Sequence, residues 1–362
     1  MSVTVATPLD APLTFKHGPA MRNRLMLAPM TTMQSRDDGT MSDEEFHWLA
    51  MRAAAGFGMT MTCASHVQEV GRGFLGQMGV WSDDHLAGLS RLAAAINAAG
   101  SVSTLQLHHA GERAEPFPGQ PVVAPWDRAD RNTRALTTDE VKQAIDAFIQ
   151  GAVRSEKAGF AGVELHGAHG YLPAQFLDQR NMREDGYGGS YEDRTRFIRE
   201  TLDGIRAATG RDFQLGLRLS PERRGGDMGE ALRFARESML SGVIDYLDIS
   251  LWDCFKDPDD PAYKGRPLIA YFVELPRGDC RLAVAGKIMS AADAQRCLDT
   301  GADFLAIGRG AILHHDFAGQ AIADPGFVSV PIPVTREYLH GEGVSPAFAQ
   351  YLAGLWKAGI AD

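Results

Sequence analysis

The sequence predicts an α/β fold, a closed (β/α)8 TIM barrel, and three observations support this class. Short apolar segments alternate with amphipathic helical segments along most of the 362 residues. Eight such alternations are present, and the apolar segments lack the in-out pattern of half-buried strands, as expected for parallel strands buried on both faces. The alternative is a doubly wound open sheet, but no Gly-x-Gly-x-x-Gly pattern follows the first strand. Eight β/α units therefore favour the closed barrel.

The predicted strands are short apolar runs, and the predicted helices begin near capping residues and mostly end at a glycine. The strands are Leu25–Ala28, Met59–Cys63, Val102–Leu107, Val163–His166, Gln214–Leu219, Tyr246–Ser250, Arg281–Ala285 and Phe304–Ile307. The helices are Ser42–Ala55, Asp83–Ala99, Thr138–Ala158, Tyr191–Ala208, Met228–Ser241, Arg266–Leu275 and Ala291–Thr300. Ser42 precedes Glu45 by three positions, the spacing of a capping box, and Thr138 is the predicted N-cap of the third helix.

Two long loops interrupt this alternation, 110–137 after the third strand and 167–190 after the fourth. We expect them to carry function, since long loops in compact domains usually do. One domain, 1–362, is predicted. In it residues 1–24 cap the bottom of the barrel, and residues 317–362 form a C-terminal tail whose last part is amphipathic.

Composition and charge narrow the class of partner. The net charge is −10, from 46 acidic and 36 basic residues, which argues against nucleic acid or an anionic membrane as the main partner. The four cysteines are scattered without a Cys-x-x-Cys pair, so we expect a reducing compartment and no metal site. No secretory signal pattern is present, and no apolar run approaches ~20 residues. These features predict a cytoplasmic protein that acts on a small molecule.

The stretch Gly162–Tyr171 concentrates reactive side chains at the end of the fourth strand. His166, His169 and Tyr171 fall within six positions, separated by small residues that allow tight turns. Imidazoles and a phenol at the carboxyl end of a strand are typical of active sites in parallel α/β folds. By itself the stretch is equally compatible with two surface histidines and a packing tyrosine.

Glycines and basic residues follow the seventh and eighth strands. Gly286-Lys287 and Gly308-Arg309-Gly310 occur where many barrels bind a phosphate group. Glycine lets backbone N–H groups approach the phosphate closely, and arginine can bind it bidentately. The alternative is an ordinary helix start with a surface arginine.

Two polar residues, Gln106 and Arg218, lie inside or at the end of buried strands. A buried arginine needs an anionic partner, for which a core carboxylate such as Glu164 is one candidate. A flavin is the other, because it offers an anionic N1 to the arginine and a pyrimidine edge to the glutamine. These residues alone leave both partners open.

With these residues in view, the chain resembles the old yellow enzyme family, flavin-dependent barrels that reduce activated alkenes. The resemblance runs from about Leu9 to His315, and the motifs occur in order on a β/α-alternating chain, which makes the set highly specific. The motifs are Asn23-Arg24, Ala28-Pro29-Met30-Thr31, Gln106-Leu107, His109-Ala110-Gly111, Gly162–Tyr171, Asn181-x-Arg183-x-Asp185-x-Tyr187-Gly188-Gly189-Ser190, Arg194, Arg196-Phe197, Arg218 and Ile307-Gly308-Arg309.

The resemblance implies a tightly but noncovalently bound FMN. Thr31 would hydrogen-bond the O4 side of the flavin, Gln106 would contact the pyrimidine ring, and Arg218 would face N1 and O2. Backbone at the first two strand ends would border the ring, while glycines and an arginine at the last two would hold the phosphate. These residues are Pro29, Met30 and Ala64 for the ring, and Gly286, Gly308 and Arg309 for the phosphate.

The resemblance also implies a reaction. In such enzymes NAD(P)H reduces the flavin and leaves before an α,β-unsaturated carbonyl or nitro compound binds, which is a ping-pong order. His166 and His169 would donate hydrogen bonds to the substrate oxygen, flavin N5 would deliver hydride, and Tyr171 would supply the proton. The alternatives are a flavoenzyme of the same fold that oxidises or demethylates a small amine or carbonyl compound, and a flavin-binding barrel without turnover.

Several positions depart from the family pattern. Met33 stands where tyrosine is often found, and Trp126 and Trp252 add bulk around the predicted mouth. We therefore expect these three residues to line a pocket suited to a substrate that is smaller, flatter or different in kind. The C-terminal tail matches no family pattern. A homo-oligomer is left open, as is the choice between NADH and NADPH.

Overall fold

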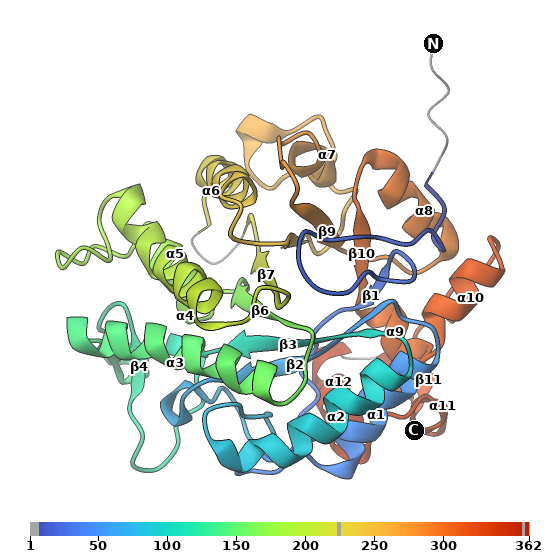
Figure 1. The fold of residues 1–362 in the computed structure, drawn as a ribbon, viewed down its shortest axis with the longest axis horizontal. Coiled ribbons are helices and arrows are strands. Elements are labelled where there is room, and N and C mark those ends of the chain that lie inside the picture. The colour runs from blue at the N-terminus through green and yellow to red at the C-terminus, as the bar shows by residue number, and fades with distance from the viewer. Residues whose placement is uncertain (1–6, 223–225, 357–358, 362) are drawn as a thin grey trace.

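A closed barrel of parallel strands forms the core of the protein, for which a computed structural model describes residues 7–222, 226–356 and 359–361 (Figure 1). Around the barrel the strands follow the order β1-β10-β9-β8-β7-β6-β3-β2. Their bounds are β1 (Leu25–Leu27), β2 (Met59–His66), β3 (Val102–His108), β6 (Gly162–Gly167), β7 (Gln214–Leu219), β8 (Tyr246–Ser250), β9 (Arg281–Ala285) and β10 (Phe304–Ile307). The predicted (β/α)8 class is confirmed.

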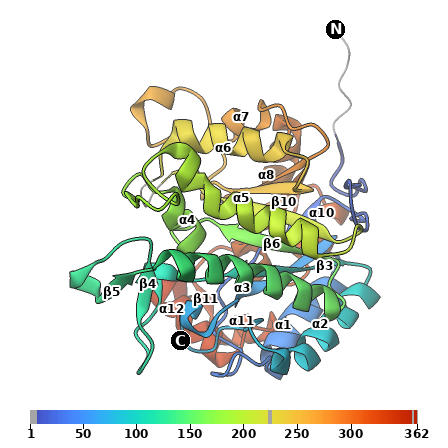
Figure 2. The same ribbon diagram turned by 60° about the vertical axis from the view of Figure 1, so that its left-hand side comes forward.

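Helices cover the outside of the barrel, as the two views in Figures 1 and 2 show. The helices that follow barrel strands are α1 (Asp43–Ala54), α2 (Leu86–Ala98), α3 (Thr138–Lys157), α5 (Tyr191–Ala208), α6 (Met228–Leu240), α7 (Leu268–Val273), α8 (Ala291–Thr300) and α9 (Arg309–Leu313). None of the helices in the described part of the chain is long and apolar enough to cross a bilayer.

Shorter elements lie in the loops and in the tail. Those in the loops are η1 (Glu69–Gly71), η2 (Asp83–His85), η3 (Gly111–Arg113), β4 (Val122–Ala124), η4 (Ala129–Arg131), β5 (Thr133–Ala135), α4 (Leu172–Leu177) and η5 (Pro261–Tyr263). Those in the tail are α10 (Phe317–Ala323), β11 (Val334–Thr335), α11 (Arg336–Gly341), α12 (Pro346–Trp356) and β12 (Ile360–Ala361). The predicted amphipathic end of the tail is therefore helical.

The N-cap of α3 is Thr137 rather than the predicted Thr138. The Glu140 backbone N–H donates to the Thr137 hydroxyl oxygen at 3.2 Å, and the Thr137 N–H donates to the Glu140 carboxylate at 2.8 Å. Only the first of the two adjacent threonines has a glutamate three residues later, so only it can form a capping box. At α1, Ser42 accepts a hydrogen bond from the Glu45 N–H, as predicted.

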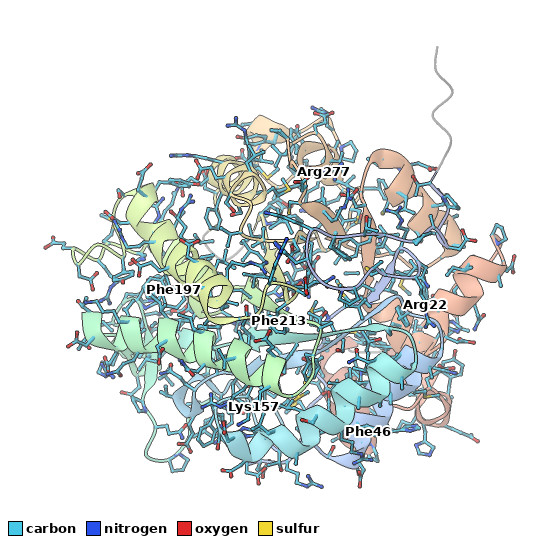
Figure 3. The ribbon with its side chains drawn as sticks, viewed as in Figure 1. Arg22, Phe46, Lys157, Phe197, Phe213 and Arg277 are labelled. Atoms are coloured by element: carbon cyan, nitrogen blue, oxygen red, sulfur yellow. The ribbon has the colours of Figure 1, made fainter. Side chains whose placement is uncertain are left out.

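The segment before β1 packs against the amino-terminal end of the barrel. Phe15 contacts Tyr246 and Phe304, the first residues of β8 and β10, with ring centroids 6.0 and 5.8 Å apart. Arg22, labelled in Figure 3, donates hydrogen bonds to backbone carbonyl groups at the ends of α1 and α2. Apolar side chains thus pack across the amino-terminal end of the barrel.

Aromatic packing and buried amides hold the long loop after β6. Phe176 of α4 stacks on Phe197 of α5 with ring centroids 4.3 Å apart, and Figure 3 labels Phe197 on that helix. The Asn181 side chain donates to the carbonyl groups of Phe176 and Tyr187 at 2.9 and 2.7 Å. The motif that begins at Asn181 thus fixes the loop that follows His166.

Candidate active site

A cavity of about 670 Å³ lies at the carboxyl ends of the barrel strands. Pockets that bind cofactors and small ligands have volumes of roughly 300–1,000 Å³. Each of the eight strands contributes a residue from its carboxyl-terminal part or from the position that follows it. These residues are Ala28, Ala64, Gln106, His166, Arg218, Ser250, Ala285 and Ala306. The cavity therefore has the position and the size of a barrel active site.

Most of the predicted site residues line this cavity together. His166, His169 and Tyr171 lie in it, and so does Trp252. The residues predicted to contact a cofactor that also line it are Pro29, Met30, Thr31, Ala64, Gln106, Arg218, Gly286, Gly308 and Arg309. The fold thus brings strand ends that are far apart in sequence to one place.

Met33 and Trp126 do not belong to the lining of the cavity as the structure describes it. Met33 has a left-handed φ of 56°. Its carbonyl oxygen packs against Gly76, where an added Cβ would lie 2.6 Å from that oxygen. Trp126 donates its indole N–H to Glu112 at 2.9 Å. The indole therefore supports the 110–137 loop, and of the two tryptophans expected to add bulk at the mouth, Trp252 alone lines the cavity.

Three imidazoles and one hydroxyl form a continuous chain in the cavity. His108 Nδ1 lies 3.2 Å from His166 Nδ1, and His166 Nε2 lies 2.9 Å from His169 Nδ1. His169 Nε2 lies 2.8 Å from Ser250 Oγ. At the other end, the buried His108 Nε2 has no hydrogen-bond partner among the described residues. An unpaired acceptor is less costly to bury than an unpaired N–H, so the N–H groups of the chain donate toward Ser250.

Burial keeps two histidines of this chain neutral. It lowers the pKa of His108 and His166 well below 6.5, and nearby cationic groups add to the shift. Burial also lowers the pKa of His66 to about 4 and that of His109 to about 3. Although several histidines gather here, no group of three or more His, Cys, Asp or Glu in the described ranges could hold a metal ion. His108 and His166 therefore present neutral imidazoles at pH 7.

These buried imidazoles predict sensitivity to acid. The unfolded chain binds a proton at each histidine near pH 6.5, whereas folded His109 binds one only near pH 3. His109 therefore does not change the free energy of unfolding with pH above about pH 6.5. As the pH falls from 6.5 toward 3, it lowers the free energy of unfolding by up to about 1.4 kcal/mol per pH unit. Denaturant unfolding at about pH 5 and pH 7.5 should show a smaller pH effect in His109→Asn than in the wild type. An exposed control, His47→Asn, should match the wild type; an unchanged slope in His109→Asn would contradict the prediction.

Three residues with left-handed backbone surround the cavity. His169, Trp252 and Lys287 have φ values of 59°, 64° and 56°, and all three line it. Such conformations cost non-glycine residues energy and persist where the surrounding structure enforces them, often at functional sites. The backbone here is shaped to present these side chains to the cavity.

A buried charged network lies under one side of the cavity. Arg218 Nε is 2.9 Å from Asp248 Oδ2, so Asp248, rather than Glu164, is the carboxylate that pairs with this arginine. Gln106 Nε2 donates to Glu164 Oε1 at 2.8 Å. Burial raises the pKa of Glu164, and the charge of Asp248 adds to this effect. Burial raises the pKa of Asp248 as well, and the charge of Arg218 opposes this shift in both carboxyl groups.

The two glycines at the ends of β9 and β10 meet different surroundings. A Cβ at Gly286 would lie 2.9 Å from the backbone nitrogen of Cys254, so packing requires glycine there. A Cβ at Gly308 would have a single heavy atom within 4 Å, at 3.9 Å, so this backbone borders open space. Lys287 and Arg309, the residues that follow these glycines, both line the cavity. Two positive charges thus lie where an anionic group could bind.

Sequence reasoning missed two contributions to the site. Arg113 donates a hydrogen bond to the His169 carbonyl group, and its guanidinium lies 4.5 Å from the centre of the Tyr171 ring. The second contribution comes from one face of α12, namely Phe348, Tyr351, Leu352, Leu355 and Trp356. Their spacing of three and four residues marks a helix with one apolar face, but spacing does not tell what that face contacts.

Comparison with known proteins shows the family. A model of the NADH:flavin oxidoreductase / NADH oxidase family matches residues 8–321. The chain is 36% identical over 315 residues to the probable NADH-dependent flavin oxidoreductase YqiG of Bacillus subtilis, which covers 83% of this chain and 84% of that protein.

Solved structures agree with this match. Morphinone reductase superposes with a TM-score of 0.77 at 27% identity, over 93% of this chain and 94% of that one. The old yellow enzyme homologue from Zymomonas mobilis superposes with a TM-score of 0.77 at 25% identity, over 92% of this chain and 96% of that one. The barrel, the strand-end cavity and these matches lead to one conclusion. The chain belongs to the old yellow enzyme family of FMN-dependent oxidoreductases that use NAD(P)H.

Proposed function

We propose that this protein reduces the C=C bond of α,β-unsaturated carbonyl or nitro compounds, with NAD(P)H as the electron donor in a ping-pong reaction. One observation carries the proposal. His166, His169 and Tyr171 line the same cavity as the residues suited to FMN. Donors for a developing oxyanion and a proton source therefore lie next to the place from which a hydride would come.

The residues around the cavity fit FMN. The open space beside Gly308, together with Arg309, suits the phosphate, and Gly286 lies at the neighbouring strand end. Gln106 and Arg218 offer an amide and a buried cation to a pyrimidine edge. We assign the remaining contacts to Pro29, Met30 and Ala64 beside the ring and to Thr31 at its O4 side.

In the proposed reaction two histidines bind the substrate oxygen and a tyrosine supplies the proton. Bound FMN would supply the hydride to the β-carbon from N5. His166 and His169 would donate hydrogen bonds to the substrate oxygen, and Tyr171 would give its hydroxyl proton to the α-carbon. In the protein described here His166 and His169 are hydrogen-bonded to each other. With the N–H groups directed toward Ser250, the substrate oxygen would accept from His166 Nε2–H in place of His169 Nδ1, and from His169 Nε2–H in place of Ser250 Oγ.

An anaerobic titration tests the proposal. The purified protein should be yellow and should release FMN on denaturation. NADH or NADPH should bleach it, and 2-cyclohexen-1-one or maleimide should restore the colour. Bleaching without recovery by either alkene would favour the relatives that oxidise amines or carbonyl compounds. Failure to bleach with either nucleotide would favour flavin binding without turnover, and both results contradict the proposal.

Arg309→Ala is expected to weaken FMN binding by roughly ten- to 100-fold. A hydrogen bond to a charged group contributes about 1.5–3 kcal/mol, and this substitution removes such a donor from the proposed phosphate site. The measurement is a titration of the apoprotein with FMN, followed by flavin fluorescence. Arg211→Ala, an exposed arginine before β7 at the opposite end of the barrel, is the control. Equal dissociation constants for Arg309→Ala and the wild type would show that Arg309 does not bind the FMN phosphate.

A further inference from the structure

The C-terminal helix α12 turns one face toward the cavity. Phe348, Tyr351, Leu352, Leu355 and Trp356 all contribute to the lining. Residues at this spacing lie on one side of a helix, because 3.6 residues complete a turn. Neither the proposed FMN contacts nor the proposed proton transfer gives this face a role.

Both ends of α12 are attached to the protein. Phe348 is fully buried and packs edge-on against Trp48 of α1, with ring centroids 5.0 Å apart. Just before the helix, the Ser345 N–H donates to the Gln34 side chain at 3.1 Å. Beyond the helix, β12 pairs with β11. The position of α12 over the cavity is therefore fixed from both sides.

Tyr351 brings α12 close to the proposed reacting groups. Burial raises the pKa of Tyr351, and interaction with the Thr31 hydroxyl opposes this shift. The nearby Tyr171 and Arg113 also influence the pKa of Tyr351, in opposite directions. The helix therefore lies beside the proposed flavin O4 contact and within electrostatic reach of the proposed proton donor.

The last turn of α12 forms part of the cavity rim. Leu355 lines the cavity although 59% of its surface is exposed, and Trp356 follows it in the lining. Trp252, after β8, is another rim residue, with 52% of its surface exposed. Large apolar side chains from α12 and from the loop after β8 thus lie at the rim of the cavity.

We propose that α12 is the wall that limits substrate size, with Leu355 and Trp356 excluding bulky substituents. This inference rests on the proposed function, which supplies the class of substrate. It assigns to the tail the bulk that was expected from Trp126. The preferred substrates are then activated alkenes with small or flat substituents.

The test compares maleimide with N-phenylmaleimide, which differ by one phenyl group. Leu355→Ala should raise the ratio of kcat/KM for N-phenylmaleimide to that for maleimide about tenfold, since contacts with a few carbon atoms discriminate on this scale. Leu355→Trp should lower the same ratio, and Trp356→Ala should raise it. Leu240→Ala removes an exposed leucine from α6, outside the cavity lining, and should leave the ratio unchanged.

A binding measurement separates this inference from the proposed function. Changes in the flavin absorption of the oxidised holoenzyme give dissociation constants for both maleimides without turnover. The ratio of these constants should shift in the same directions as the kinetic ratio. If both ratios in the Leu355 and Trp356 variants equal those of the wild type, α12 is not the size-limiting wall. Absence of maleimide reduction by the wild type would overturn the proposed function, and the binding ratios would still decide the role of α12.

Discussion

Tyr171→Phe is expected to slow alkene reduction by roughly 10²- to 10⁴-fold, the usual contribution of a general acid. Reduction of the bound FMN by NAD(P)H should stay near the wild-type rate, because that step needs no proton from this phenol. The substitution keeps the aromatic ring, which packs on His108 with centroids 4.3 Å apart and lies beneath Arg113. The effect therefore isolates the hydroxyl group.

Stopped-flow absorption measures the two half-reactions of Tyr171→Phe separately. Tyr271→Phe is the matched control, because its hydroxyl bonds to the Tyr263 carbonyl group on the outside of the barrel. If both half-reactions of Tyr171→Phe run at wild-type rates, Tyr171 is not the proton donor. If only reduction by NAD(P)H slows, the residue acts in nucleotide binding instead.

His166→Ala is expected to lower the rate of alkene reduction by roughly 10²- to 10³-fold. Removal of one donor to a developing oxyanion has an effect of this size. His166→Asn keeps an N–H donor, so its rate of alkene reduction should fall less. Because burial holds the pKa of His166 well below 6.5, the imidazole is neutral at pH 7 and donates without a full charge.

The pH dependence gives a second readout for His166. The rate of alkene reduction should show no step from this residue between about pH 6.5 and 8, since a lowered pKa places its protonation at lower pH. Rates of the wild type, His166→Ala and the exposed control His47→Ala are compared across this range. A wild-type step near pH 6.5 that vanishes in His166→Ala would contradict the prediction, because it would show that this imidazole titrates within the range.

Most of the barrel could be predicted from the sequence because its strands are buried on both faces. The bounds of β7, β8, β9 and β10 agree with the predicted segments, each an apolar run closed by polar or small residues. β2 is longer than predicted and continues to His66. Its register against β3 shifts between Met61 and Ala64, and small and polar residues then continue the pairing. A hydrophobic pattern does not reveal such an irregular continuation.

The strand-end residues of the site could also be predicted, since parallel strands in a barrel converge at their carboxyl ends. The parts of the cavity wall that come from the loops and from the tail could not be predicted from the sequence. Trp126 looked suited to the mouth, but its indole bonds to Glu112 within its own loop. The place of α12 depends on contacts such as Phe348 with Trp48, which join distant parts of the chain. Periodicity predicts that a helix forms there but not where it packs.

The C-terminal tail lies beyond the part of the chain that matches the family model. The match ends at residue 321, and α12 spans Pro346–Trp356. With α12 as the size-limiting wall, reaction chemistry and substrate scope are encoded in separate stretches of the chain. Mutations in the tail can then change which molecules are accepted without altering the groups that transfer hydride and proton. Exchange of tails between relatives becomes a direct route to new selectivity on an unchanged catalytic barrel.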